Sequence, residues 1–230
     1  MPIRLVLFDL DDTLYPESDF VFSGFRRVAQ AVEEKFGIER SLVFGLLTRE
    51  FFIDRRLVID RVLRVLGLYC EGLVRELVEL YRTHNPQISL YEDARIVIPI
   101  LKEHQMMLGI VTDGHPVTQR LKVQALQIEE YFDKIVYTWE LGLNCSKPSI
   151  VPFVKILTES SVSPKEAIFV GDNLEKDFKG PKDIGMKSVQ VLREGIYKNA
   201  VAPDQSYEPD FRIFSLTELF DIIRRLDSSM

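Results

Sequence analysis

The chain has 230 residues, of which 46% are hydrophobic and 28% charged, and its formal net charge is −6. This length and composition are typical of a globular protein with one domain or two small ones. The negative charge, without a run of Lys or Arg, argues against nucleic acid as a partner, and the lack of a long apolar stretch argues against a membrane. Cys70 and Cys145 lack Cys-x-x-Cys spacing, so we expect neither zinc nor disulfides, and the cytoplasm is the expected compartment.

The first predicted element is a short strand over residues 3–8, which ends in closely spaced carboxylates. The apolar run is typical of a buried central strand, and Asp9, Asp11 and Asp12 follow it directly. Carboxylates this close repel one another, and burying them without a cation is unfavourable. Mg²⁺, which binds carboxylate and carbonyl oxygens, is the expected cation. A simple polar turn is the alternative interpretation.

The segment 16–89 is predicted to be an all-helical insertion. Apolar residues recur at three- and four-residue spacing, which predicts helices over 20–36, 41–52, 56–66 and 71–81. The run His84-Asn85-Pro86-Gln87 then interrupts the helical pattern. We therefore expect a core formed by residues 1–15 and 90–230, and a helical cap formed by residues 16–89. Because the insertion follows the acidic turn, it could close over that turn as a lid.

Strands and helices alternate from Tyr91 onwards. The pattern predicts helices over 92–104, 116–126, 148–159, 174–184 and 215–226, and strands over 106–112, 134–138, 167–170 and 186–192. Pro99 is expected to kink or end the first of these helices, and residues 194–209 are expected to form a surface loop. Repeated strand–helix units predict an α/β fold, with a doubly wound, Rossmann-like parallel sheet between two layers of helices.

Polar side chains follow four of the predicted strands, and together they suit phosphoryl transfer. Asp9 could attack a phosphorus as a nucleophile, and Asp11 could donate and accept the required protons. Thr112, Asp113 and Gly114, between a strand and a helix, could bind phosphoryl oxygens through a hydroxyl and backbone N–H groups.

Lys147, before Pro148, offers an ammonium group that could neutralise both Asp9 and the transferring phosphoryl group. Asp172 and Asp177 follow the strand over 167–170 and could complete the Mg²⁺ site. Each of these signals taken singly is also consistent with a turn or a solvated surface. Their occurrence in this order, each after a strand, favours an active site.

Four segments of the chain resemble the motifs of the haloacid dehalogenase superfamily, in particular its phosphatases with a helical cap inserted after the first motif. The segments are Asp9-Leu10-Asp11-Asp12-Thr13-Leu14, Ile110-Val111-Thr112-Asp113-Gly114, Lys147-Pro148, and Gly171-Asp172 through Asp177. The third departs from the family pattern, because Ser149-Ile150 stands where the family commonly has Asp-Pro.

The resemblance implies a Mg²⁺-dependent enzyme with Asp9 as nucleophile and Asp11 as acid and base. It implies a metal held by Asp9, the backbone carbonyl of Asp11, and Asp172. Thr112 would bind the phosphoryl oxygens, and Asp177 would orient Lys147 or a metal-bound water.

The expected activity is hydrolysis of a small phosphorylated metabolite, such as a sugar phosphate, a nucleoside monophosphate or phosphoglycolate, by a monomer or homodimer. A phosphomutase is an alternative because it would share the pair Asp9 and Asp11. A metal-independent dehalogenase is disfavoured because it needs neither Asp11 nor the acids at 172 and 177. A non-catalytic binding module is the remaining alternative.

Overall fold

The computed structural model describes residues 2–142, 144–195 and 197–228. The chain divides into two compact units. Unit 1 comprises residues 1–17 and 89–230, and unit 2 comprises residues 18–88. The junctions predicted from the sequence, 15/16 and 89/90, differ from these by two residues and by one residue.

Over its described residues, unit 1 contains a six-stranded parallel sheet in the order β3-β2-β1-β4-β5-β6. The strands are β1 (Leu5–Phe8), β2 (Met107–Thr112), β3 (Lys134–Tyr137), β4 (Ala167–Gly171), β5 (Lys187–Val191) and β6 (Phe211–Ile213). β1 is central, and its Leu7 pairs with Gly109 of β2 and Phe169 of β4. Its four residues are at most 1% exposed, which explains why the run is apolar without alternation.

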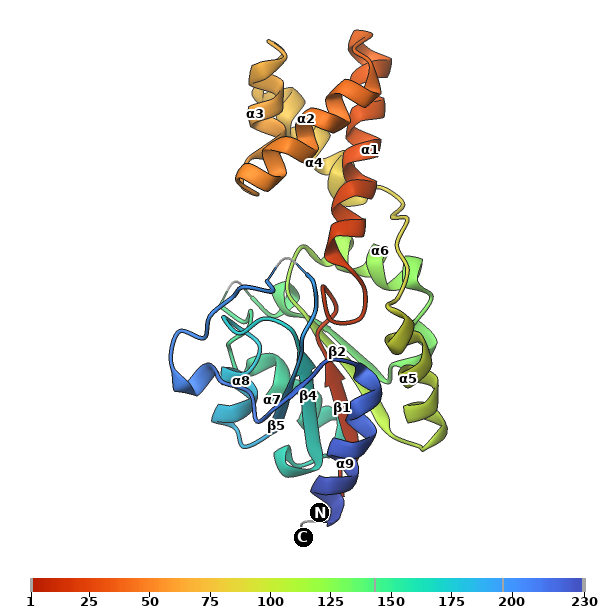
Figure 1. Ribbon diagram of the computed structural model, residues 1–230, viewed down its shortest axis with the longest axis vertical. Helices are drawn as coiled ribbons and strands as arrows, with labels where there is room; N and C mark the ends of the chain where they lie inside the picture. The colour runs from red at the N-terminus through yellow and green to blue at the C-terminus, as the bar shows by residue number, and fades with distance from the viewer. Residues whose placement is uncertain (1, 143, 196, 229–230) are drawn as a thin grey trace. The chain divides into compact units, whose positions relative to one another are not determined.

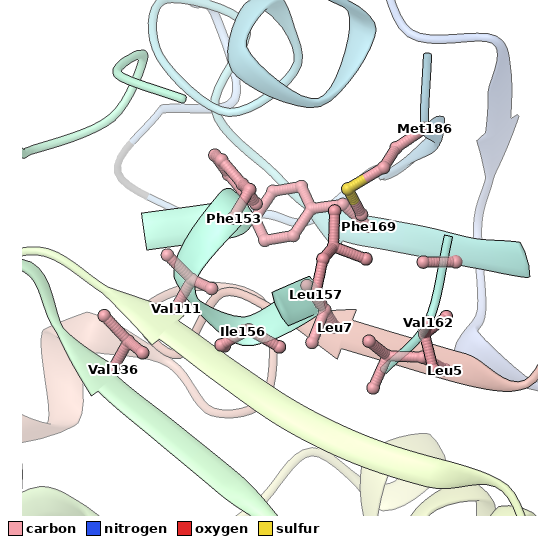
Figure 2. Packing of buried hydrophobic residues seen from close by; sticks show 11 residues of the cluster. Leu5, Leu7, Val111, Val136, Phe153, Ile156, Leu157, Val162, Phe169 and Met186 are labelled. Carbon is pink, nitrogen blue, oxygen red and sulfur yellow. The ribbon is translucent and has the colours of Figure 1, made fainter. Parts of the chain in front are cut away.

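Helices cover both faces of this sheet. They are α5 (Glu92–Glu103), α6 (Pro116–Leu126), α7 (Val151–Ser160), α8 (Lys179–Asp183) and α9 (Leu219–Ser228). Figure 1 shows α5 and α9 on one side of the strands and α7 and α8 on the other. On the α7 side, Phe153 packs edge-on against Phe169, with ring centroids 5.0 Å apart (Figure 2). The doubly wound parallel fold is therefore confirmed.

The strand order reverses beside β1, and this reversal determines where a ligand can bind. The chain builds β2 and β3 on one side of β1, then returns to build β4, β5 and β6 on the other side. The connections after β1 and β4 diverge to opposite faces, which leaves a crevice at their carboxyl ends. Asp9 follows β1, and Asp172 follows β4.

Unit 2 is helical throughout its regular structure. It contains α1 (Glu17–Phe36, whose first residue belongs to unit 1), α2 (Arg40–Ile53), α3 (Val58–Val65) and α4 (Glu71–Thr83). Phe22, Phe25 and Phe51 pack against one another with ring centroids 5.9–6.4 Å apart, joining α1 to α2. The apolar residues that recur at helical spacing in this part of the sequence thus form packing surfaces between helices. None of the helices in the described part of the chain combines the length and apolar composition needed to cross a membrane.

The helix predicted over 174–184 is wrong in its first half, because α8 begins only at Lys179. The preceding residues form turns held by side chains. Asn173 accepts a hydrogen bond from the backbone N–H of Glu175 at 2.9 Å, and Asp177 accepts bonds from the backbone N–H groups of Asp172 and Asn173. Such local side-chain bonds compete with helix formation.

Other boundaries also differ from the predictions. The helix expected from Pro148 begins at Val151, and the last helix is preceded by a separate 3₁₀ turn over Leu216–Glu218. Strand β6 was not predicted, since its three residues are too short for a clear periodic signal. Pro99 lies inside α5 and does not end it. Within 194–209 the structure has a single 3₁₀ turn, Gln205–Tyr207, and residue 196 lies outside the described residues.

A partly buried ion pair connects three segments of unit 1. Arg193 donates two hydrogen bonds to Asp93, at 2.9 Å each, and one to the backbone carbonyl of Thr13 at 3.1 Å. Asp93 also accepts from the backbone N–H of Leu216 at 2.8 Å. Burial alone would raise the pKa of Asp93, but the bonds from Arg193 and Leu216 outweigh it and lower that pKa.

Asp93→Asn is therefore expected to lower the free energy of unfolding by about 2–3 kcal/mol at neutral pH, because it leaves Arg193 without its carboxylate. A lowered folded-state pKa gives stability that is complete above the ordinary value of 3.8 and is lost as the pH falls below it. Denaturant unfolding at neutral pH and near pH 3 measures both effects. The difference in unfolding free energy between the variant and the original protein should be smaller at the lower pH. A difference in unfolding free energy that does not depend on pH would contradict this account. Asp221→Asn, on the exposed face of α9, is the control.

Candidate active site

Segments far apart in the sequence meet at the carboxyl ends of β1 and β4. The ammonium of Lys147, from the loop between β3 and α7, lies 2.7 Å from Asp9 Oδ1 and 2.7 Å from Asp177 Oδ1. Asp9, Asp172 and Asp177 each offer a carboxylate oxygen, and these three atoms lie within 4.8 Å of one another. The structure therefore brings together Asp9, Lys147, Asp172 and Asp177, as the sequence predicted.

The ion pairs around Lys147 are buried. The side chains of Lys147 and Asp177 are 0% exposed, and that of Asp9 is 2% exposed. Burial raises the pKa of Asp9 to about 6, despite the opposing effect of Lys147 and Lys176. For Lys147, burial alone would lower the pKa, but Asp177 and Asp9 hold it above its usual value. Lys147 is thus a permanent cation beside one oxygen of Asp9.

Asp177 is held rigidly by the end of β4. Its Oδ2 accepts hydrogen bonds from the backbone N–H groups of Asp172 and Asn173, at 3.2 and 2.9 Å, while its Oδ1 contacts Lys147. A Cβ atom at Gly171 would lie 2.5 Å from Asp177 Oδ2, so only glycine leaves room for the carboxylate there. Since both of its oxygens are engaged, Asp177 is better suited to fixing Lys147 than to binding a metal.

Asp11 is surrounded by hydrogen-bond donors. Its Oδ1 accepts from Lys122 Nζ at 2.7 Å and from the Tyr15 hydroxyl, and its Oδ2 accepts from Gln119 Nε2 at 2.8 Å. Burial raises the pKa of Asp11, but Lys122, Tyr15 and Gln119 together outweigh it and lower that pKa. With its side chain so engaged, Asp11 could serve a metal only through its backbone carbonyl.

The end of β2 is connected to Asp11 through Gln119. Gln119 Nε2 donates to Thr112 Oγ1 at 2.6 Å as well as to Asp11. Gly114 follows with a φ of 129°, a region that favours glycine, and a Cβ atom there would lie 3.3 Å from the Gln119 side chain. Thr112, Asp113 and Gly114 therefore border the same site as Asp11.

The side chain of Asp113 performs a positioning role in this structure. Its Oδ1 accepts from the Thr138 hydroxyl at 2.7 Å and from the backbone N–H of Lys147 at 3.1 Å. Burial raises its pKa, but Lys147 and Lys176 outweigh that effect and lower it. The Asp113 side chain thereby fixes the loop that carries Lys147. The part of Asp113 that is suited to binding substrate is therefore its backbone N–H group.

Asp172 is the carboxylate best suited to a metal ion. It is 7% exposed, and Thr13 Oγ1 donates to its Oδ1 at 3.3 Å. Burial, followed by Asp177 and Asp9, raises its pKa well above the usual value. Two buried carboxylates, Asp9 and Asp172, thus lie close together, and their raised pKa values show that their negative charge is not fully compensated. Hard oxygen donors of this kind fit Mg²⁺.

Several residues at the site were not assigned a role from the sequence. They are Tyr15, Gln119, Lys122 and Lys176, together with Glu17. Lys176 Nζ lies 3.5 Å from Asp113 Oδ2 and 3.9 Å from Asp9 Oδ2. Burial, followed by Asp11, raises the pKa of Glu17 to about 7. Gln119 and Lys122 are three residues apart on one face of α6, the helix that follows the β2 strand end, and this spacing could have identified them as site residues.

Three comparisons place the chain among known proteins. Residues 6–191 match the family model described as haloacid dehalogenase-like hydrolase. The chain is 34% identical to the glyceraldehyde 3-phosphate phosphatase of Methanopyrus kandleri, over 97% of this chain and 98% of that protein. It is 28% identical to the pyrophosphatase PpaX of Bacillus cereus, over the full length of both. A crystal structure of a phosphatase of this family from Thermococcus onnurineus superposes with a TM-score of 0.62, at 27% identity and over 97% of this chain and 98% of that one.

Proposed function

Because the chain belongs to the haloacid dehalogenase-like hydrolase family, we propose that it is a Mg²⁺-dependent phosphatase that hydrolyses a small phosphorylated metabolite. The observation that carries this proposal is the environment of Asp9. One of its oxygens is 2.7 Å from Lys147, and its carboxylate lies within 4.8 Å of the carboxylate of Asp172. A buried carboxylate between a fixed ammonium and a candidate metal ligand is suited to attack on a phosphorus atom.

In the first step, an oxygen of Asp9 would form a bond to phosphorus while the bond between phosphorus and the ester oxygen breaks. Asp11 would give a proton to the departing oxygen. In the second step, water would attack the same phosphorus, Asp11 would take a proton from that water, and the bond between Asp9 and phosphorus would break. Free phosphate and the alcohol are the products, and both aspartates regain their starting forms.

The lowered pKa of Asp11 favours its ionised form, which is the form that accepts the proton of water in the second step. Donation in the first step requires a protonated Asp11. A phosphate dianion that enters beside Asp11 would raise that pKa by repulsion between like charges. Lys122 and Gln119 would meanwhile hold the carboxylate in a fixed orientation.

Asp9, Asp172 and the backbone carbonyl of Asp11 are the groups that would hold Mg²⁺. The ion would supply positive charge against the oxygens of the transferring phosphoryl group. This chain's own residues would do the rest: Lys147 neutralises one oxygen of Asp9, Asp177 fixes Lys147, and Thr112 binds a phosphoryl oxygen.

Asp172→Asn is expected to weaken the affinity for Mg²⁺ by at least about tenfold, because an amide replaces one of two anionic ligands. Calorimetric titration with Mg²⁺ measures this directly, and the Mg²⁺ dependence of phosphate release gives a second measure. Asp183→Asn, at an exposed ion pair on α8, should bind Mg²⁺ like the original protein. An unchanged Mg²⁺ affinity in Asp172→Asn would remove Asp172 from the metal site.

For the substrate, we propose a triose phosphate or another small phosphate monoester, with support from the 34% identity to a glyceraldehyde 3-phosphate phosphatase. We also propose that the helical insertion, residues 16–89, is the cap domain of this enzyme. In support, the chain ends that flank this insertion are joined within unit 1, where the backbone N–H of Tyr91 donates to the carbonyl of Leu14 at 2.9 Å.

The experiment is a phosphate-release screen with and without Mg²⁺, over glyceraldehyde 3-phosphate, other sugar phosphates, nucleoside monophosphates, phosphoglycolate and pyrophosphate. We expect Mg²⁺-dependent release from at least one monoester. Transfer of the phosphoryl group between two positions of one sugar, without free phosphate, would instead indicate a phosphomutase. Absence of release from every compound, p-nitrophenyl phosphate included, would contradict the proposal.

A further inference from the structure

Two lysines lie beside Asp9, and their environments differ. Lys147 is 0% exposed, and its ammonium lies 2.7 Å from a carboxylate oxygen of each of two aspartates. Lys176 has a side chain that is 27% exposed, and its ammonium lies 3.5 Å from Asp113 Oδ2 and 3.9 Å from Asp9 Oδ2. The first set of distances is that of close ion pairs, whereas the second is longer than a good hydrogen bond. Lys147 is fixed at close range by two acids, whereas Lys176 lies among the acids with only longer contacts to Asp113 and Asp9.

The backbone of Lys176 is nevertheless fixed relative to Asp9. Its N–H donates to the carbonyl of Asn173 at 3.3 Å, and the N–H of Asp177 donates to the same carbonyl at 3.0 Å. The turn that follows β4 therefore anchors Lys176 at its Cα, while four methylene groups carry the ammonium towards the second oxygen of Asp9. Lys147 makes its 2.7 Å contact with the other oxygen, Oδ1.

The charges at the site favour a role for Lys176 in binding substrate. A phosphate monoester brings up to two negative charges to a site that already holds Asp9, Asp11, Asp113, Asp172 and Asp177. Among the described residues, three lysines are ion-paired with these acids. Lys122, with a 5% exposed side chain, is bound to Asp11, and Lys147 is bound to two acids. Neither can turn to a ligand without giving up a close ion pair at 2.7 Å, that of Lys122 with Asp11 or those of Lys147 with Asp9 and Asp177, which is unfavourable.

Lys176 can leave Asp113 without removing all the hydrogen bonds of that carboxylate. Asp113 keeps its hydrogen bonds from Thr138 and from the backbone of Lys147 if the ammonium of Lys176 moves away. We infer that Lys176 is a substrate-binding residue, whose ammonium leaves Asp113 and binds a non-bridging oxygen of the phosphoryl group when the ester enters. This inference rests on the proposed function, and it assigns the mobile positive charge of the site to a residue that the sequence motifs do not single out.

Binding of inorganic phosphate tests the inference without turnover. In the presence of saturating Mg²⁺, Lys176→Met and Lys176→Gln should raise the dissociation constant of phosphate about 10- to 100-fold, the usual worth of one charge-assisted hydrogen bond. Lys176→Arg should restore most of the affinity, since it keeps the charge. Lys179→Met, three residues on, with a side chain 33% exposed in an ion pair with Asp183, is the matched control and should leave phosphate affinity unchanged.

Calorimetry with Mg²⁺ alone separates a binding role from a structural one. If Lys176 binds the phosphoryl group, the Mg²⁺ affinity and the melting temperature of Lys176→Met stay close to those of the original protein. Phosphate affinity that is unchanged in both neutral variants would overturn the inference, and so would an equal loss of affinity for phosphate and Mg²⁺. An original protein that neither binds phosphate nor releases it from any ester would instead overturn the proposed function.

Discussion

Asp9→Asn is expected to abolish phosphate release, because an amide cannot form the acyl phosphate on which hydrolysis depends. Stability should change in the opposite sense. Burial raises the folded-state pKa of Asp9 to about 6, from an ordinary value of 3.8, so the ionised carboxylate opposes folding at neutral pH. That cost is present above pH 6 and disappears as the pH falls towards 3.8. A neutral amide removes it, and the free energy of unfolding of the metal-free variant should rise.

Phosphate release by freshly purified protein and denaturant unfolding without Mg²⁺ measure the two effects. Asp9→Ala is the second variant, because it cannot revert to aspartate by deamidation. Asp221→Asn, on the exposed face of α9, should match the original protein in both measurements. Turnover by Asp9→Ala at a rate near that of the original protein would show that another group attacks the phosphorus.

Lys147→Met should have the second largest effect, on both stability and activity. The ammonium lies between Asp9 and Asp177, and all three side chains are at most 2% exposed. Its removal leaves Asp177 without its ion pair and Asp9 with only the longer contact to Lys176 at 3.9 Å. Breaking a buried pair in this way costs about 3–5 kcal/mol of unfolding free energy. The loss of a fixed positive charge beside the nucleophile should also lower kcat by about 10²–10³-fold.

A double variant separates the loss of stability from the loss of activity. Lys147→Met with Asp177→Asn also removes the charge of the carboxylate that lost its ion pair, so the double variant should regain part of the lost stability without regaining activity. Lys102→Met, which breaks an exposed pair with Asp133, should change stability by less than about 1 kcal/mol. If Lys147→Met were as stable as the original protein, the pairing of Lys147 with both acids would not describe the folded state.

The parts of the fold that were predictable from the sequence are those with strong local patterns. The uninterrupted apolar run of β1 predicted a central parallel strand, and Pro116 with the apolar spacing that follows predicted the bounds of α6. The late start of α8 was not predictable by pattern, because it depends on side-chain bonds from Asn173 and Asp177 to nearby backbone groups. In such a segment, helix-like spacing is overridden by capping chemistry.

The same distinction applies to the site. Acidic residues at strand ends predicted that Asp9 and Asp172 would lie together, because parallel strands share one carboxyl edge. The contacts of Gln119 and Lys122 with Asp11 depend on how one face of α6 packs, which the sequence does not specify. Lys176 was missed for a different reason. A lone lysine in a turn is typical of a solvated surface, and only the course of the turn after β4 directs it towards Asp9.

The central claim is that Asp9 carries the phosphoryl group during turnover, and trapping the intermediate tests it most directly. The protein is mixed with substrate and Mg²⁺, quenched during the first turnover, and reduced with borohydride, which converts an aspartyl phosphate into homoserine. Peptide mapping by mass spectrometry should then find homoserine at position 9 in the original protein, and no homoserine when substrate is omitted. Homoserine at another aspartate, or steady phosphate release with residue 9 always recovered as unmodified aspartate, would contradict the account.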